Sequence, residues 1–421
     1  MTACSSDPAK KISVQTGGTG GKASTSDAGN GGSTGSSGTG GNSTGNGGTG
    51  GSQFSPDADN DGFTVADGDC ADDSPQRNPG AFDFPGNGDD EDCSGKDATA
   101  EEAACDGMLP LGSIDAKDGA RAIGLCTFTT ESTRKWGVIS ARYVQADGSG
   151  SLASPTQVGL LPDFGALKPR QGKAMLALSS GVARAPNQAD YTDSCDLFTA
   201  GPSAPPKGYP KASPACPDAP SGDVYDPAAL ELRIRVPTNA KSLGFDSDFY
   251  TYEYPNYVCQ QFNDFFVAML DPKPENLPDG NILFDQDGNP VSVNNSLLQV
   301  CEAGAHGGKT FACPQGTDLL AGTGFDGTAG CGTEAPLFPG FFGGGLFGGG
   351  GAMDAGAPMG AGAATGWLHT AAPVTGGSII TLRFAIWDSG DATLDSLAVV
   401  DHFEWSLEKP IKIITTTVIP E

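Results

Sequence analysis

Residues 226–301 read DPAALELRIRVPTNAKSLGFDSDFYTYEYPNYVCQQFNDFFVAMLDPKPENLPDGNILFDQDGNPVSVNNSLLQVC. Near the start of this stretch, four apolar residues alternate with three charged ones: Leu230, Leu232, Ile234 and Val236 against Glu231, Arg233 and Arg235. This period of two is typical of a β-strand with one buried and one solvent-facing side. Strand-like runs follow at residues 243–250, 262–270 and 290–293, separated by Pro, Asn, Asp and Gly. The stretch predicts a mostly β fold, an antiparallel, jelly-roll-like β-sandwich.

The flanking sequence extends this pattern. We expect residues 98–122 to begin with a short helix, followed by strands at 123–128 and 136–145 and by an edge strand at 412–419. Residues 379–387 and 397–405 read as two strands across the turn-rich DSGDATLD. Its acids, Asp388, Asp391 and Asp395, have two interpretations. They cap a turn, or they bind a Ca²⁺ ion together with acids of the central stretch.

The central stretch also carries a family resemblance. DPAALELRIRVP, FYTYEYPNYV, FNDFFVAML and GNPVSVNNS, in this order, resemble the choice-of-anchor L domain, a β-rich module of bacterial cell-surface proteins. The likeness continues at GKAMLALSSGVA and SIITLRFAIWDSGDATLDSLAVV, so it covers roughly residues 158–405. The resemblance implies a protein attached to a cell surface, and it implies no particular activity.

Composition separates the chain into parts. With 63 glycines and 37% hydrophobic residues among 421, part of the chain is not packed core. Residues 16–52, almost wholly Gly, Ser, Thr and Asn, are typical of a disordered linker. The net charge of −27 argues against nucleic acid and anionic membranes as partners, and it favours divalent cations. We therefore expect an anchor at 1–15, the linker at 16–52, an Asp-rich metal-binding segment at 53–97 and the sandwich at 98–421.

The N-terminus, MTACS, resembles the end of a bacterial lipoprotein signal, in which the cysteine is cleaved and lipidated. This assigns Cys4 to lipidation and implies an exported, outer-membrane-anchored or secreted protein. The charged and apolar parts of a signal peptide are missing, which indicates a true start upstream of Met1.

The Asp-rich segment holds 13 acidic and two basic residues between 53 and 97. Aspartates at alternate positions before a glycine can wrap their carboxylates around one hard cation, as in an EF-hand loop. The twelfth position of an EF-hand loop is a glutamate, whereas this chain has Gly68 there. DADNDGFTVADGDCADDSPQRNPGA followed by DDEDC resembles the MopE-type metal-binding motif of secreted bacterial proteins. The expected Ca²⁺ ligands are Asp57, Asp59, Asp61, Asp67 and Asp69 with the carbonyl of Phe63, and a second group comprises Asp72, Asp73, Asp89, Asp90 and Asp92. The alternative is a solvated acidic spacer.

Eleven cysteines indicate an oxidising compartment. With Cys4 set aside, ten remain for five disulfides. Pairing of sequence neighbours is one of many connectivities, and it would join Cys70 to Cys93, Cys105 to Cys126, Cys195 to Cys216, Cys259 to Cys301 and Cys313 to Cys331.

Two further features have alternative interpretations. The Gly-rich insertion at 322–366 contains Phe, Leu and Met, and it is a disordered insertion or an exposed loop for self-association. Tyr250, Tyr252, Tyr254 and Tyr257 are candidate ligand contacts if exposed, although strand aromatics usually pack in the core.

The chain offers little for catalysis, because only three histidines are present and they are scattered. Glu253 and Asp264 would be the acid pair of a glycoside-acting enzyme. We expect instead a non-enzymatic, calcium-stabilised surface lipoprotein that presents a β-sandwich for adhesion to a polysaccharide or protein, or to another copy of itself. A structural envelope component is the alternative.

Overall fold

The computed structural model describes residues 57–100, 105–192, 202–219, 222–327 and 360–418. All described residues belong to one compact unit. The predicted anchor with Cys4, the linker, and most of the Gly-rich insertion lie outside the described residues. No helix of the described residues is long and apolar enough to span a membrane.

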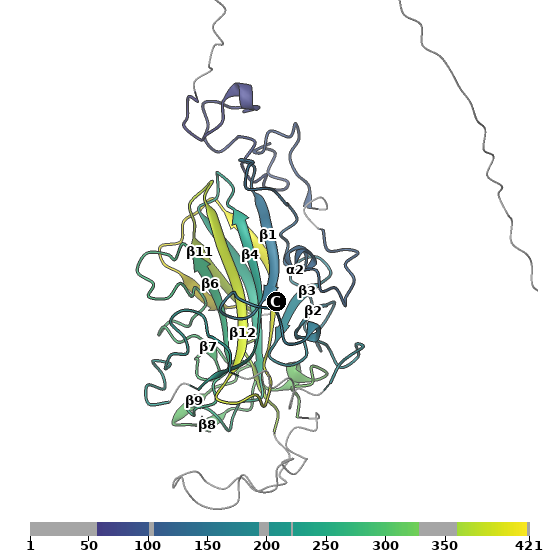
Figure 1. Ribbon diagram of the computed structural model, residues 1–421, viewed down its shortest axis with the longest axis vertical. Helices are drawn as coiled ribbons and strands as arrows, with labels where there is room; N and C mark the ends of the chain where they lie inside the picture. The colour runs from purple at the N-terminus through teal and green to yellow at the C-terminus, as the bar shows by residue number, and fades with distance from the viewer. Residues whose placement is uncertain (1–56, 101–104, 193–201, 220–221, 328–359, 419–421) are drawn as a thin grey trace, which may run out of the picture. The chain divides into compact units, whose positions relative to one another are not determined.

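Two antiparallel sheets pack against each other, which confirms the predicted β-sandwich (Figure 1). Sheet A has the strand order β1-β4-β12-β6-β7, and sheet B has the order β14-β11-β5-β13-β3-β2, with β10 beside β5. Sheet A comprises β1 (Gly137–Val144), β4 (Val224–Arg235), β12 (Ile379–Ser389), β6 (Phe265–Asp271) and β7 (Val291–Ser292). Sheet B comprises β14 (Ile414–Thr417), β11 (Leu368–Pro373), β5 (Ser242–Thr251), β13 (Leu397–Ser406), β3 (Met175–Ser179), β2 (Val158–Leu161) and β10 (Ala363–Ala364).

The remaining elements are short. They are the helix α2 (Ala116–Ala122), the 3-10 turns η1 (Val65–Asp67), η2 (Pro155–Gln157) and η3 (Asp318–Leu320), and the hairpin of β8 (Gly304–His306) and β9 (Lys309–Phe311).

Strand β4 has the alternation that its sequence predicts. Leu230, Leu232 and Ile234 are fully buried, while the charged residues between them are partly exposed. β4 pairs with β1 on one side and β12 on the other, so it is a central strand of sheet A. The core between the sheets includes an edge-to-face contact of Phe245 on β5 with Phe384 on β12, whose ring centroids lie 4.9 Å apart.

The strand expected at 123–128 does not form. Ile123 ends helix α2, and Gly124 follows with a left-handed φ of 96°, which breaks an extended run. Only Phe128 makes a bridge, to Val138. Residues 101–104, near the start of the stretch expected to begin with a helix, lie outside the described residues. The described helix α2 begins at Ala116, where the side chain of Asp115 caps the backbone N–H of Lys117 at 2.9 Å.

The structure contains four disulfides among its described cysteines, and it corrects part of the predicted pairing. Cys70–Cys93 and Cys105–Cys126 form as predicted. Cys216 pairs with Cys259, and Cys301 pairs with Cys313, so the pairings 195–216, 259–301 and 313–331 were wrong. The β8–β9 hairpin accounts for the last bond, because it brings Cys301 and Cys313 to a Cα separation of 5.2 Å. Cys195 and Cys331 lie outside the described residues.

Candidate metal centre and adjoining cleft

The first three aspartates of the Asp-rich segment meet around one point. One oxygen each of Asp57, Asp59 and Asp61 lies within 4.8 Å of the others. The loop closes because Asn60 and Gly62 adopt left-handed φ angles of 64° and 98°. The spacing of the three aspartates thus produces the convergence that the sequence predicts.

In each of these carboxylates, one oxygen bonds to the loop backbone and the other faces the common centre. One oxygen accepts a backbone N–H: Asp57 from Gly62 at 3.0 Å, Asp59 from Asp61 at 3.1 Å and Asp61 from Phe63 at 2.8 Å. The other oxygen of each is buried and accepts no hydrogen bond, and the same holds for Oδ2 of Asp69. Burial, and then the charges of Asp59 and Asp69, raise the pKa of Asp61. Four buried oxygens without donors suit a hard cation.

The other residues predicted as ligands of this site make different contacts. The carboxylate of Asp67 accepts from Thr64 and forms an ion pair with Arg134 at 2.7 Å, and these contacts lower its pKa. Phe63 is buried, with the Arg134 guanidinium 4.5 Å from its ring centroid. Asp72 accepts the backbone N–H of Ala58 at 3.2 Å and so ties the loop to the segment.

The second acidic group is only partly as predicted. Asp90 and Asp92 converge with Asp83, which the sequence analysis missed, within 4.8 Å. Burial and the neighbouring Glu91 raise the pKa of Asp83 to about 6. Asp89 instead forms an ion pair with Arg77, and Asp73 lies in a turn, its N–H bonded to the carbonyl of Ala71. Asp83 stands alone between two phenylalanines, without the alternate spacing that marks the first group.

Side chains of the loop after β4 attach the segment to the sandwich. Asn239 accepts the backbone N–H of Phe82 at 2.9 Å and donates to its carbonyl at 2.9 Å. Thr238 donates its hydroxyl to Asn78 at 2.8 Å and its N–H to Gly80 at 3.0 Å. The Asp-rich segment is therefore positioned by specific bonds to the β4–β5 connection.

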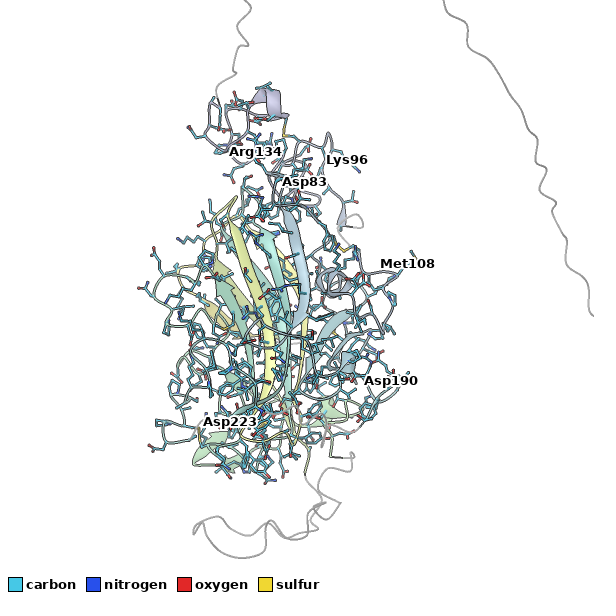
Figure 2. The ribbon with its side chains drawn as sticks, viewed as in Figure 1. Asp83, Lys96, Met108, Arg134, Asp190 and Asp223 are labelled. Atoms are coloured by element: carbon cyan, nitrogen blue, oxygen red, sulfur yellow. A yellow bond between two sulfur atoms is a disulfide. The ribbon has the colours of Figure 1, made fainter. Side chains whose placement is uncertain are left out.

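A cleft of about 590 Å³ lies between this segment and sheet B. Figure 2 labels Asp83 and Lys96, which line it from the segment. Its aromatic side chains are Phe82, Phe84, Trp136, Phe403 and Trp405, and its polar ones include Asp83, Asp92, Lys96, Gln171, His402 and Glu404. Such a mixture of apolar surface and a few polar groups is typical of ligand sites.

The aromatic rings of the cleft form a continuous row. Centroid separations are 4.9 Å from Phe84 to Phe82, 5.3 Å from Phe82 to Trp136, 6.5 Å from Trp136 to Trp405 and 4.9 Å from Trp405 to Phe403. Phe82, Phe84 and Trp136 are only partly buried. Adjacent rings meet edge to face, and the partly buried ones offer apolar surface to a ligand.

The other candidate contacts are inside the protein. Tyr250, Tyr252 and Tyr254 are at most 2% exposed, which confirms the core assignment. Glu253 and Asp264 are each 1% exposed, so neither is open to a polymeric substrate in this structure. No family model, curated protein or solved structure matches the chain. Function is therefore inferred from the geometry of the site.

Proposed function

We propose that this chain is an exported, non-enzymatic binding module in which Ca²⁺ stabilises the Asp-rich segment and the adjoining cleft binds a polysaccharide. One observation carries the proposal: three carboxylates of the segment, those of Asp57, Asp59 and Asp61, turn buried, unbonded oxygens toward a common centre. Without a cation these charges repel one another.

The ligand atoms favour Ca²⁺ over other metals. The two groups offer carboxylate oxygens, and the sulfurs of Cys70 and Cys93 beside Asp69 are engaged in a disulfide. Oxygen-only sets suit hard cations, and Ca²⁺ accepts six to eight oxygens in a flexible geometry, whereas Mg²⁺ requires a near-ideal octahedron. Zinc and copper sites draw on nitrogen or sulfur ligands, which both groups lack.

The cleft supports a polysaccharide as the ligand. Sugar rings present faces of C–H groups that pack on aromatic rings, and their hydroxyls bond to charged and amide side chains at the edges. Phe82 and Trp136, which are partly exposed, supply the first kind of contact, and Asp92 and Gln171 supply the second. Because Asp83 and Asp92 belong to an acidic group and also line the cleft, we expect binding to depend on Ca²⁺.

Two further points support a surface location. Four disulfides are consistent with an oxidising compartment outside the cytoplasm. The resemblance of residues 158–405 to choice-of-anchor L domains, and of MTACS to a lipoprotein signal, supports attachment to a cell surface through a lipid on Cys4.

A thermal melt in Ca²⁺ and in chelator tests the calcium part. A ligand that binds only the folded state stabilises it by about 2.7 kcal/mol at 100 times its dissociation constant. We expect the Ca²⁺-dependent rise in melting temperature to shrink in the double variant Asp59→Asn/Asp61→Asn and to persist in Asp318→Asn, which alters an exposed carboxylate outside both groups. If the Ca²⁺-dependent rise in melting temperature is unchanged in the double variant, the segment is a solvated acidic spacer and not a calcium site.

Binding to a panel of purified neutral and acidic polysaccharides tests the cleft. Trp136→Ala should weaken binding roughly tenfold, the scale of an aromatic hot spot. The control is Trp367→Ala, which removes a partly buried tryptophan outside the cleft. Calcium-dependent stability without any ligand would favour the structural envelope component instead, and turnover of a polysaccharide would overturn the non-enzymatic assignment.

A further inference from the structure

A second cavity lies against sheet B, separate from the cleft beside the Asp-rich segment. It has a volume of about 410 Å³ and shares no lining residue with that cleft. Its walls come from residues 166–170, from Asp248 and Tyr250 on β5, and from residues near η3 and β11. Pockets that hold small molecules have volumes of about 300–1,000 Å³, so the cavity is large enough for a small ligand.

Much of the cavity wall is apolar and partly open to solvent. Leu167, Leu319 and Val418 line it, and Trp367 adds an aromatic ring. All four side chains are only partly buried. A ligand with an apolar body would cover this surface and remove it from water, which is favourable.

Two cationic side chains line the same cavity. Arg170 is exposed, its Nε donates to Asp246 at 3.1 Å, and within the described structure its terminal nitrogens donate no hydrogen bond. Lys168 pairs with Asp163 at 3.3 Å, but its side chain is 66% exposed. Both groups are therefore accessible to an anion. Guanidinium groups bind carboxylates particularly well, because they donate two parallel hydrogen bonds.

Asp248 is the acidic residue of the wall, and the protein itself occupies its oxygens. The hydroxyl of Tyr250 donates to Oδ2 at 3.0 Å, and the hydroxyl of Thr365 lies 3.1 Å from Oδ1. Burial raises the pKa of Asp248 to about 7, although these hydrogen bonds act to lower it. The lining residues therefore carry a net positive charge near neutral pH, in a chain whose net charge is −27.

We propose that this cavity binds a small amphipathic carboxylate, whose charged group pairs with Arg170 and Lys168 and whose apolar body packs against Trp367. A neutral molecule would leave both cations without a partner, and a purely polar acid would leave the apolar wall in contact with water. The site shares no residue with the cleft or with the two acidic groups. It is therefore a second binding function, independent of the polysaccharide binding proposed above.

A ligand-detected NMR titration of the full chain tests the proposal with three probes. Phenylacetate joins a carboxylate to an aromatic ring, phenylacetamide lacks the charge, and glucuronate lacks the apolar body. We expect phenylacetate to saturate the protein with a dissociation constant of about 1 mM or lower, the scale for a ligand of this size. The other two probes should bind roughly tenfold more weakly, because each loses one of the two kinds of contact.

Variants assign the binding to the cavity. Arg170→Gln should weaken phenylacetate binding about tenfold, and Trp367→Ala should weaken it on the same scale. Lys168→Gln, which alters an exposed side chain, should also weaken it. The matched control is Lys241→Gln, because Lys241 is an exposed lysine outside the cavity, and its loss should leave binding unchanged.

Each other outcome overturns part or all of the proposal. If phenylacetate does not saturate the wild type at roughly ten times the expected dissociation constant, the cavity is not such a site. Equal binding of phenylacetamide refutes the role of the cations, and equal binding of glucuronate refutes the role of the apolar wall. If Arg170→Gln does not fold, unchanged binding in Lys168→Gln refutes the charge pairing. Binding that appears only after removal of residues 419–421, which follow Val418, means that the chain itself fills the cavity, and this also overturns the proposal.

Discussion

His402 Nδ1 lies 3.1 Å from one oxygen of Asp246, and His369 Nδ1 lies 2.8 Å from the other. The carboxylate is 2% exposed and also accepts from Arg170 at 3.1 Å. Although burial by itself acts in the opposite direction, these three donors hold the pKa of Asp246 well below its usual range. The hydrogen bond to Asp246 raises the pKa of His402, against the effect of its own burial.

This pairing predicts how stability depends on pH. A histidine whose pKa is raised by folding contributes stability below its unfolded value, near 6.5, and that contribution is lost as pH rises through the folded pKa. Asp246, whose pKa is lowered by folding, contributes stability above about pH 4, and this stability is lost as pH falls. Asp401 and Glu404 also face His402 and add to the rise in its pKa. We expect the contribution of the pair to be largest between about pH 5 and 6.5.

Urea unfolding at pH 5.5 and 8.5 measures the effect in the wild type and in His402→Gln. The wild type should lose more stability than the variant over this interval, by roughly 0.5–1 kcal/mol, because solvent screens a ring that is one-third exposed. His306→Gln is the control, since His306 contacts none of these acids in the described structure. Equal losses in wild type and His402→Gln would contradict the prediction.

The contact between Phe245 and Phe384 predicts a large cost for truncation. Phe384 is fully buried between the sheets, so Phe384→Ala leaves a cavity and should lower the free energy of unfolding by about 3–5 kcal/mol. Ile411→Ala removes a side chain that is fully exposed, and it should change that free energy by less than about 0.5 kcal/mol. Urea denaturation compares the two. A loss below 1 kcal/mol for Phe384→Ala would place the ring outside the core.

The disulfides predict two different losses of stability. Cys216 and Cys259 are 43 residues apart, whereas Cys301 and Cys313 are 12 apart. The loop-entropy relation assigns about 4 kcal/mol to the first bond and about 3 kcal/mol to the second. Replacing both cysteines of a pair with serine should therefore cost more for the first pair, as measured by denaturant unfolding. Peptide mapping of the unreduced protein provides the control, and a peptide joining Cys259 to Cys301 would contradict the pairing.

Local pattern explains which parts of the fold the sequence could predict. The alternation in β4 reports the two faces of one strand, and the spacing of Asp57, Asp59 and Asp61 closes a loop within a few residues. Both features depend on neighbours in the chain, and the structure shows the strand and the convergence of the three aspartates.

Long-range contacts explain what the sequence did not predict. Asp246 meets histidines 123 and 156 residues away, and no local pattern marks such a meeting. Asp83 joins Asp90 and Asp92 only once the segment has folded back on itself. Three of the five predicted cysteine pairs were wrong, because Cys216 pairs with Cys259, 43 residues away, and this leaves Cys301 to pair with Cys313.

The ion pairs on the outer side of sheet A yield the last prediction. Glu231 on β4 accepts from Arg383 on β12, with Nη2 at 2.6 Å and Nε at 3.0 Å, and it also pairs with Arg142 on β1. Burial by itself would raise the pKa of Glu231, but the two arginines lower it. Side-chain exposure is 18% for Arg383 and 59% for Arg142, so the first pair is much less screened by solvent.

We therefore expect unequal costs for two chemically similar substitutions. Arg383→Ala should lower the free energy of unfolding by about 2–4 kcal/mol, because it leaves a mostly buried carboxylate with only an exposed partner. Arg142→Ala should cost at most about 1 kcal/mol. Urea unfolding at pH 7, at low and high salt, measures both, and salt should reduce only the smaller effect appreciably, because screening acts mainly on exposed charges. Equal costs would mean that Glu231 is screened by solvent on both sides, contrary to its burial.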